Sequence, residues 1–393
     1  MRSFLASRTT SSALLLVGIF LIAANLRAPV TALPPVLGAI QHGLDLGVVA
    51  AGALTTLPLL AFALLSPFSA LFARAFGLER SLFGAMVAIA LGIVLRSLGP
   101  GWLLYLGTML IGMGIAVGNV LLPGLVKRDF AQQVASLTSA YVLAMGIAAA
   151  LGSAVVVPLT RAWGWQIALG TFIVLPLAAM AVWTSQLRQR HIPAADPAPL
   201  AQAGSVWRSA LAWQVTLFLG LNSTIYYVVV GWLPTVLIDA GQAPDYAGSL
   251  HGVLQLATAV PALFMGRLLR GLSDQRVPAA ATAGLSLIGL LGLMVWPQWS
   301  LLWSVLFGLG TGAGMILGLS FVGLRSHNAQ QAAALSGMSQ CMGYLLAAAG
   351  PMAMGALHDG LGGWLVPLGL CALLALCAVW VGLLAGRNLQ LKA

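Results

Sequence analysis

The chain has 393 residues, of which 60% are hydrophobic and only 7% carry a formal charge. A soluble domain has roughly 25% charged residues, so this composition excludes a soluble enzyme and indicates an integral membrane protein. The apolar runs are about 20 residues long, which predicts transmembrane helices rather than the strands of a barrel. The net charge of +10 is explained by basic loops retained in the cytoplasm, and it gives no reason to expect a nucleic-acid partner.

The first apolar stretch, 12–37, carries an arginine well inside it. An ionised side chain at that depth costs between ~3 and ~17 kcal/mol if it faces lipid, so we expect Arg27 to face other helices or a watery cavity. Pro29, Pro34 and Pro35 follow and predict a bend in the outer half of this helix. The stretch is too long for the core of a cleaved signal peptide. An intramembrane cation with no obvious partner is therefore a candidate functional residue.

Further apolar stretches follow, and the sequence predicts twelve membrane spans in all. Their expected bounds are 12–37, 45–68, 81–98, 102–125, 133–157, 165–187, 211–238, 246–268, 279–297, 299–324, 331–356 and 363–386. A cytoplasmic N-terminus puts nearly all of the 18 Lys and Arg residues on the inner side and only Arg161 in an outer loop. This asymmetry predicts that both termini are cytoplasmic.

The long polar segment between spans 6 and 7 divides the chain into two related halves. We expect an N-terminal six-helix half at 1–187, a cytoplasmic linker at 188–210 and a C-terminal six-helix half at 211–393. Three glycines of span 4 recur 196 residues later in span 10, namely Gly112, Gly114 and Gly118 as Gly308, Gly310 and Gly314. Trp165 recurs as Trp364 after 199 residues. The expected fold class is therefore all-α integral membrane, with twelve transmembrane helices in two parallel six-helix repeats, the major facilitator fold.

Two short basic loops lie at equivalent positions of the two halves. The first contains Arg74, Gly77 and Arg80, and the second contains Asp274 and Arg276. They resemble degenerate copies of the major facilitator loop motif, in which glycine permits a tight turn and charges latch neighbouring helices. Any cytoplasmic loop can carry arginines, but the repetition in both halves favours a gating role.

Polar side chains inside the spans are the best guide to a substrate site. Several of them lie four residues apart and therefore share one helix face, as Asn222 and Tyr226 do. The alternative for each pair is hydrogen bonding between helices or, for tyrosine, a position at the membrane interface. Their recurrence on several helices favours a shared cavity. The full candidate set for substrate binding is Asn25, Arg27, Asn119, Tyr141, Asn222, Tyr226, Tyr227, His251, Gln255, Gln340 and Tyr344.

The placement of the ionisable residues narrows the mechanism. None of the acids lies convincingly at mid-membrane, so no multi-acid proton relay is expected. If protons are coupled to transport, His251 is the intramembrane candidate that titrates near neutrality. The alternative is a neutral histidine held by hydrogen bonds. Arg27, with no counter-ion inside the membrane, favours a substrate that is anionic or carries a polarised acceptor oxygen.

Specific runs of the sequence resemble one branch of the major facilitator transporters. Asn25-Leu26-Arg27-Ala28-Pro29 is similar to the first-helix motif of the cyanate/nitroimidazole (CynX/NimT) family. The runs 54–63, 118–130, 248–258 and 331–338 are similar as well, so the resemblance extends over nearly the whole chain. It implies the twelve-helix fold, the bacterial inner membrane and transport of a small polar or heteroaromatic compound.

The expected function is secondary active transport of a 2-nitroimidazole-like compound by alternating access, and export is the expected direction. Uptake of cyanate or another small organic anion is the alternative. A membrane-embedded enzyme or a sensor is disfavoured, because the sequence shows neither clustered catalytic side chains nor an output domain. No nucleotide-binding loop or metal-ligand spacing is visible, so we expect no cofactor and no metal. The expected partners are the lipid bilayer, a small-molecule substrate and, as a candidate coupling ion, the proton; we expect a monomer.

Overall fold

The computed structural model describes residues 2–130, 134–187, 206–269, 272–327 and 329–391, and its elements are all helical in these ranges. The N-terminal half contains α1 (Arg2–Asn25), α2 (Ala28–Thr31), η1 (Pro34–Val36), α3 (Leu37–Leu44), α4 (Val48–Phe76), α5 (Leu78–Arg96), α6 (Gly101–Asp129), α7 (Val134–Gly170), η2 (Thr171–Ile173), α8 (Val174–Trp183) and η3 (Thr184–Gln186). The C-terminal half contains α10 (Ala210–Asp239), α11 (Pro244–Ala259), η4 (Val260–Leu263), α12 (Met265–Leu268), α13 (Arg276–Val295), η5 (Pro297–Trp299), α14 (Ser300–Leu324), α15 (Ala329–Leu361) and α16 (Leu365–Ala385).

The described helices account for all of the predicted membrane spans. Ten segments are long and apolar enough to cross a membrane. One of them, Ala140–Gln186, is 47 residues long and reverses direction at Gly164, so it supplies two crossings. The remaining span is α15, a helix of 33 residues that is not among the ten. The all-helical membrane fold predicted from the sequence is confirmed.

Three spans depart from their predicted form. The first, 12–37, is broken into α1, α2, η1 and α3, because Pro29, Pro34 and Pro35 each lack the N–H that a continuous helix needs. The loop expected between spans 5 and 6 is reduced to the single residue Gly164, whose φ of 83° reverses the chain at no steric cost to glycine. The eighth span stops being α-helical at Ala259, just before Pro261, and continues as η4 and α12.

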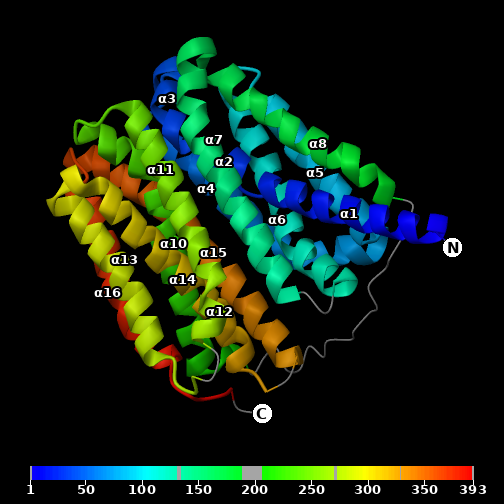
Figure 1. Ribbon diagram of the computed structural model, residues 1–393. Helices are drawn as coiled ribbons and strands as arrows, with labels where there is room; N and C mark the ends of the chain where they lie inside the picture. Colours follow the sequence, from blue (N-terminus) through cyan, green and yellow to red (C-terminus); the bar gives the residue numbers. More distant parts are fainter. Residues whose placement is uncertain (1, 131–133, 188–205, 270–271, 328, 392–393) are drawn as a thin grey trace.

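The two halves lie side by side and meet mainly where α7 packs on α11 and α4 packs on α15. Smaller contacts join α10 to η1 and α4, α11 to η1, and α7 to η4. In Figure 1 the blue-to-green half and the green-to-red half are seen as two bundles. Small residues allow the close approach: a Cβ added to Gly252 would lie 2.7 Å from the carbonyl oxygen of Ala150, as expected for membrane helix packing. Residues 188–205 of the expected linker are outside the described residues, so the division at 188–210 stays a prediction.

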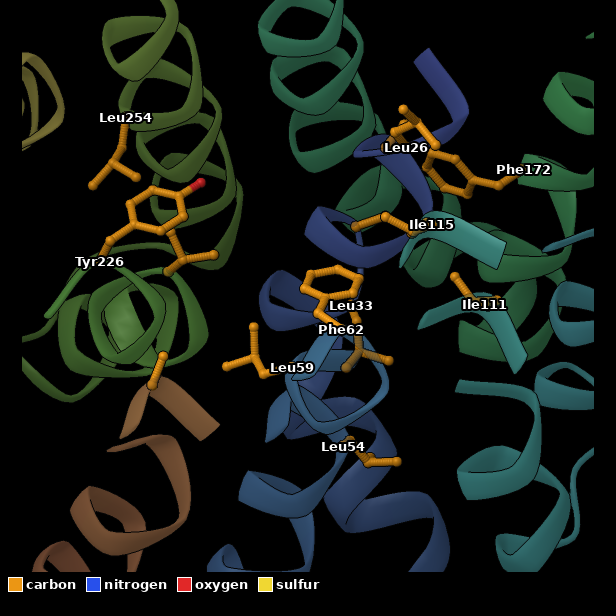
Figure 2. Close-up of a cluster of buried hydrophobic side chains, with 14 of the residues drawn as sticks. Leu26, Leu33, Leu54, Leu59, Phe62, Ile111, Ile115, Phe172, Tyr226 and Leu254 are labelled. Atoms are coloured by element: carbon orange, nitrogen blue, oxygen red, sulfur yellow. The ribbon is translucent and has the colours of Figure 1, made fainter. Parts of the chain in front are cut away.

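A core of apolar side chains continues from one half into the other. Figure 2 shows Tyr226 of α10 beside Leu254 of α11, facing the side chains that α4 and the first helices bring to the centre. Figure 2 labels Leu26, Leu33, Leu54, Leu59, Phe62, Ile111, Ile115, Phe172, Tyr226 and Leu254 from this buried cluster. The polar candidates are therefore set in an otherwise apolar interface between the halves.

The loops that carry Gly77, Arg128, Arg276 and Arg325 define one end of the molecule, which we call the basic end. Gly77 forms the whole turn between α4 and α5, with φ 89°. The charged latch beside it joins Glu79 to Arg128, with Arg128 Nη1 2.8 Å from Glu79 Oε1. The hydrogen bonds that Arg128 donates to Asp129 and Glu79 raise the pKa of Arg128, against the opposing effect of burial.

The latch residues differ from those expected from the sequence. Arg80 is exposed, and the side chain of Arg74 is outside the described residues. Asp274 pairs with Arg276, two residues away (2.8 Å), rather than with a neighbouring helix in the described part of the chain. In the C-terminal half the latch is a hydrogen bond from Arg325 to Gln275, at the repeat positions of Arg128 and Glu79. The loop motif therefore located both turns correctly, but the contacts between helices are made by residues other than those predicted.

Candidate substrate site

Arg27 lies at the break between α1 and α2. Pro29 has no N–H, so the carbonyl of Asn25 lacks its usual helical donor and α1 ends there. Arg27 adopts a non-helical conformation with φ −134° and ψ −49°, and its side chain is half-buried. Among the described residues no carboxylate lies within ion-pair distance of it. The guanidinium is thus held inside the bundle by neutral groups.

A chain of hydrogen bonds runs from Arg27 into the C-terminal half. Arg27 Nη2 donates to the Tyr226 hydroxyl at 2.6 Å, and that hydroxyl donates to Gln255 Oε1 at 2.8 Å. The amide nitrogen of Gln255 lies 3.4 Å from His251 Nε2. Three of the predicted site residues on α10 and α11 therefore meet Arg27 in one network.

The network returns to the first helices through His251. His251 Nε2 lies 3.0 Å from the carbonyl oxygen of Val230, and Nδ1 lies 2.9 Å from Ser153 Oγ. Ser153 Oγ donates to the carbonyl of Thr31 at 3.0 Å. His251 is fully buried, and its ring is bracketed by the two halves of the protein.

Aromatic rings extend this network toward α15 and α4. The Arg27 guanidinium lies 5.5 Å from the ring centre of Tyr226, within the range of a cation–π contact. Tyr226 and Tyr227 meet edge to face at 5.0 Å. Tyr344 lies 6.4 Å from Tyr227 and 5.4 Å from Phe62. The result is an aromatic cluster built by both halves, with the cation at one side.

The remaining candidates lie apart from this network. Asn222 is buried and donates to the carbonyl of Thr311 on α14, so its hydrogen bond is made inside its own half. Asn25 donates to Leu21 of its own helix. Asn119 is exposed on α6 and Tyr141 is buried on α7, and neither contacts Arg27. These four positions have the contacts of packing or surface residues.

Gln340 lines a small hollow next to the aromatic cluster. It donates to Ser336 of its own helix at 3.2 Å, and the hollow is shared with Ser223 and Tyr344. Gln340 is therefore close to the cluster without joining the hydrogen-bond network.

Several residues that make contacts at the site were not predicted from the sequence. Phe62 and Ser153 gave no pattern of their own, because a phenylalanine or a serine in an apolar span is unremarkable. The carbonyl oxygens of Thr31 and Val230 have a cue in the sequence, since each precedes a proline by four residues. A proline at that spacing removes the carbonyl's helical donor, and this could have identified both.

A family model described as Major Facilitator Superfamily matches residues 15–348. The chain belongs to this superfamily. It is therefore a secondary transporter for small molecules and not an enzyme, as expected. Among solved structures it is similar to a bacterial homolog of the human lysosomal transporter Spinster, with a TM-score of 0.75, 14% identity, and coverage of 96% of this chain and 97% of the other.

Two relatives place this major facilitator protein in the expected branch. It is 52% identical over 380 residues to the 2-nitroimidazole transporter of Escherichia coli (strain K12), covering 96% of each chain. It is 26% identical over 370 residues to the cyanate transport protein CynX of the same organism, covering 93% of this chain and 94% of the relative. The resemblance to the cyanate/nitroimidazole family is confirmed.

Proposed function

We propose that this transporter exports a small planar heteroaromatic compound of the 2-nitroimidazole class by alternating access. The observation that carries the proposal is the Arg27 guanidinium, which has no carboxylate partner among the described residues and lies against the Tyr226 ring at the edge of an aromatic cluster. A guanidinium is suited to a planar acceptor such as a nitro group. Aromatic rings stack favourably on a flat heterocycle. The high identity to a 2-nitroimidazole transporter supports the same class of substrate.

The site residues act in two groups in this proposal. Arg27 donates to the acceptor end of the substrate, while Tyr226 and Gln255 complete the hydrogen bonds around it. Tyr227 and Tyr344 stack against the ring, with Phe62 behind Tyr344. Asn25, Asn119, Tyr141, Asn222 and Gln340 belong to neither group.

The contacts between the halves support alternating access around this site. At the end opposite the basic loops, Arg161 of α7 pairs with Asp245 of α11. At the basic end, the latches Glu79–Arg128 and Gln275–Arg325 each stay within one half. Opening the far end requires the halves to separate there, while each half moves as a unit. We extend the proposal to a monomer in the bacterial inner membrane with both termini cytoplasmic, and to protons as the coupling ion.

A second candidate function is uptake of cyanate or another small organic anion. The specific observation in its favour is again Arg27, a cation with only neutral partners in the described part of the chain. A carboxylate or cyanate would form a charge-assisted hydrogen bond with it. The relative named as a cyanate transport protein supports the same reading.

Movement of labelled 2-nitroimidazole into proteoliposomes of the purified protein tests the proposal. Export by exchange with protons predicts faster accumulation when the vesicle interior is more acidic than the medium. Accumulation driven by the opposite gradient would support proton-coupled uptake instead. If 2-nitroimidazole is not moved but labelled cyanate or small carboxylates are, the substrate assignment is wrong and the second candidate stands.

A further inference from the structure

His251 and Ser153 join two backbone carbonyls that proline has left without helical donors. In a continuous helix, Val230 O would accept from residue 234 and Thr31 O from residue 35, and both of these are proline. Each carbonyl is met by a side chain instead, Val230 O by His251 Nε2 at 3.0 Å and Thr31 O by Ser153 Oγ at 3.0 Å. Buried carbonyls need such partners.

The arrangement contains three hydrogen-bonding contacts in a row. They join Thr31 O to Ser153 Oγ, Ser153 Oγ to His251 Nδ1, and His251 Nε2 to Val230 O. The serine hydroxyl supplies one hydrogen, and a neutral imidazole supplies one more. Either neutral tautomer therefore leaves one contact without a hydrogen. Only the doubly protonated ring fills all three.

We propose that His251 is the proton-binding residue of this transporter, and that Ser153 transmits its protonation state to Thr31 at the break of the first helix. This proposal depends on the proposed function in one respect only, namely that the chain is a transporter. When Nδ1 is protonated it donates to Ser153, whose hydroxyl donates to Thr31 O. When Nδ1 is unprotonated it accepts the hydroxyl hydrogen, and Thr31 O loses its donor. Thr31 Oγ1 also donates to the Arg27 carbonyl at 3.1 Å, so the effect reaches the backbone of the substrate site.

A comparison of the two related halves indicates that His251 and Ser153 are not needed for helix packing. The two first helices of the halves are related by an offset of 199 residues, which pairs Thr31 with Val230 and Arg27 with Tyr226. At the same offset, His251 corresponds to Gly52 and Ser153 to Met352. There α4 and α15 pack by backbone contact, and a Cβ added to Gly52 would lie 3.3 Å from Met352 Cα. Close packing at this crossing therefore needs neither an imidazole nor a hydroxyl.

No neighbouring charge stabilises a second proton on the His251 ring among the described residues, so hydrogen bonds alone must stabilise it. The titratable groups on the elements packed against it are Arg27 before α2, Tyr141 and Arg161 on α7, Tyr226, Tyr227 and Asp239 on α10, and Asp245 and Tyr246 on its own helix. α14, η1 and η4 contribute none. Among the described residues no carboxylate contacts the ring, and Arg27 opposes its positive charge. The proton is stabilised only while the three acceptors are in place.

The proposal predicts which conformation the proton favours. Ser153 belongs to the N-terminal half and His251 to the C-terminal half, so parting the halves at the end opposite the basic loops breaks their contact. Protonation therefore stabilises the arrangement that is closed at this end. We expect a change of about tenfold in the ratio of closed to open protein, the size expected when one buried acceptor loses its donor.

Distances between spin labels test this without any substrate. The labels are placed at Ala162→Cys and Ala243→Cys, two exposed positions at this end in opposite halves, after replacement of the three native cysteines. From about pH 8 down to about pH 4, a range extended downward because burial disfavours the charged ring, we expect the short distance to gain population in the parent protein. His251→Gln and Ser153→Ala should remove that pH dependence. Ser69→Ala should keep it, because Ser69 is buried and its hydroxyl donates to Leu65 of its own helix.

Two outcomes would overturn the proposal. One is a pH-dependent distance that persists in both His251→Gln and Ser153→Ala; the other is its absence from the parent protein. A melting temperature for each variant separates a change in switching from a loss of fold. If the distances respond as expected but 2-nitroimidazole is not transported, the proton site stands and only the substrate assignment fails.

Discussion

Tyr226 is the residue through which Arg27 reaches the C-terminal half. Its hydroxyl accepts from the guanidinium and donates to Gln255, so it uses both of its hydrogen-bonding functions. It also presents its ring to the cation. A single side chain therefore orients the arginine and forms part of the aromatic wall.

Replacing Tyr226 by phenylalanine keeps the ring and removes the hydroxyl. We expect the Kd for 2-nitroimidazole to rise about tenfold, because one hydrogen bond to a charged group is lost and Gln255 Oε1 loses its donor. Binding measured by calorimetry on the purified protein gives the value. Tyr105→Phe is the matched control, since the Tyr105 hydroxyl bonds Ala50 within the N-terminal half. An equal rise of the Kd in both variants would contradict the proposed role of Tyr226.

At the scale of elements, prolines and single glycines decide where helices break and turn. The repeat pattern and the apolar runs predicted the helices well, because burial in lipid depends on composition. The breaks were less predictable. Pro29 and Pro261 interrupt spans that composition makes continuous, and Gly164 replaces the loop expected between spans 5 and 6.

The candidate site was partly predictable from the sequence, because residues four positions apart share one helix face. Pairs at i and i+4 identified the faces that carry His251, Gln255 and Tyr226, and the structure brings these together with Arg27. The same spacing could not show that Asn222 lies outside the network. Its hydrogen bond to α14 depends on a close contact at Gly314 that only the packed structure shows. Ser153 was missed because its role depends on a carbonyl in another helix.

The turn at Gly164 should not tolerate a side chain. Gly164→Ala puts a Cβ on a residue with φ 83° and ψ 160°, a backbone region essentially restricted to glycine, at a cost of roughly 1–3 kcal/mol. We expect a lower melting temperature in detergent. Gly84→Ala in α5, where nothing lies within 4 Å of the added carbon, should instead raise it slightly, since alanine favours helix. A Gly164→Ala protein as stable as the parent would show that the turn is misassigned.

The start of α13 should be sensitive to acid through Asp274. The backbone N–H of Arg276 donates to its carboxylate at 2.9 Å, and this bond, together with the Arg276 side chain, lowers the pKa of Asp274. A depressed pKa contributes stability above the unfolded value, and that contribution is lost as pH falls through the folded value, below about pH 4. Thermal unfolding should therefore show a smaller acid loss in Asp274→Asn than in the parent. An identical loss would contradict this.

At the scale of the whole molecule, the two halves are similar bundles with different tasks at their interface. The N-terminal half supplies Arg27 and Phe62, and the C-terminal half supplies Tyr226, Tyr227 and Tyr344. The proposed site is complete only where both halves contribute. In the proposed mechanism, a rocking motion of one half against the other would take the arginine away from the rings and would couple substrate binding to the change of access.

The claim that Arg27 holds the substrate is tested most directly by binding of 2-nitroimidazole to the Arg27→Ala protein. Loss of a charge-assisted hydrogen bond is worth about 1.5–3 kcal/mol, so we predict a Kd about tenfold to about 150-fold higher than that of the parent. Arg267→Ala, which removes an exposed arginine on α12, should bind as the parent does. Unchanged binding and transport in Arg27→Ala would contradict the account.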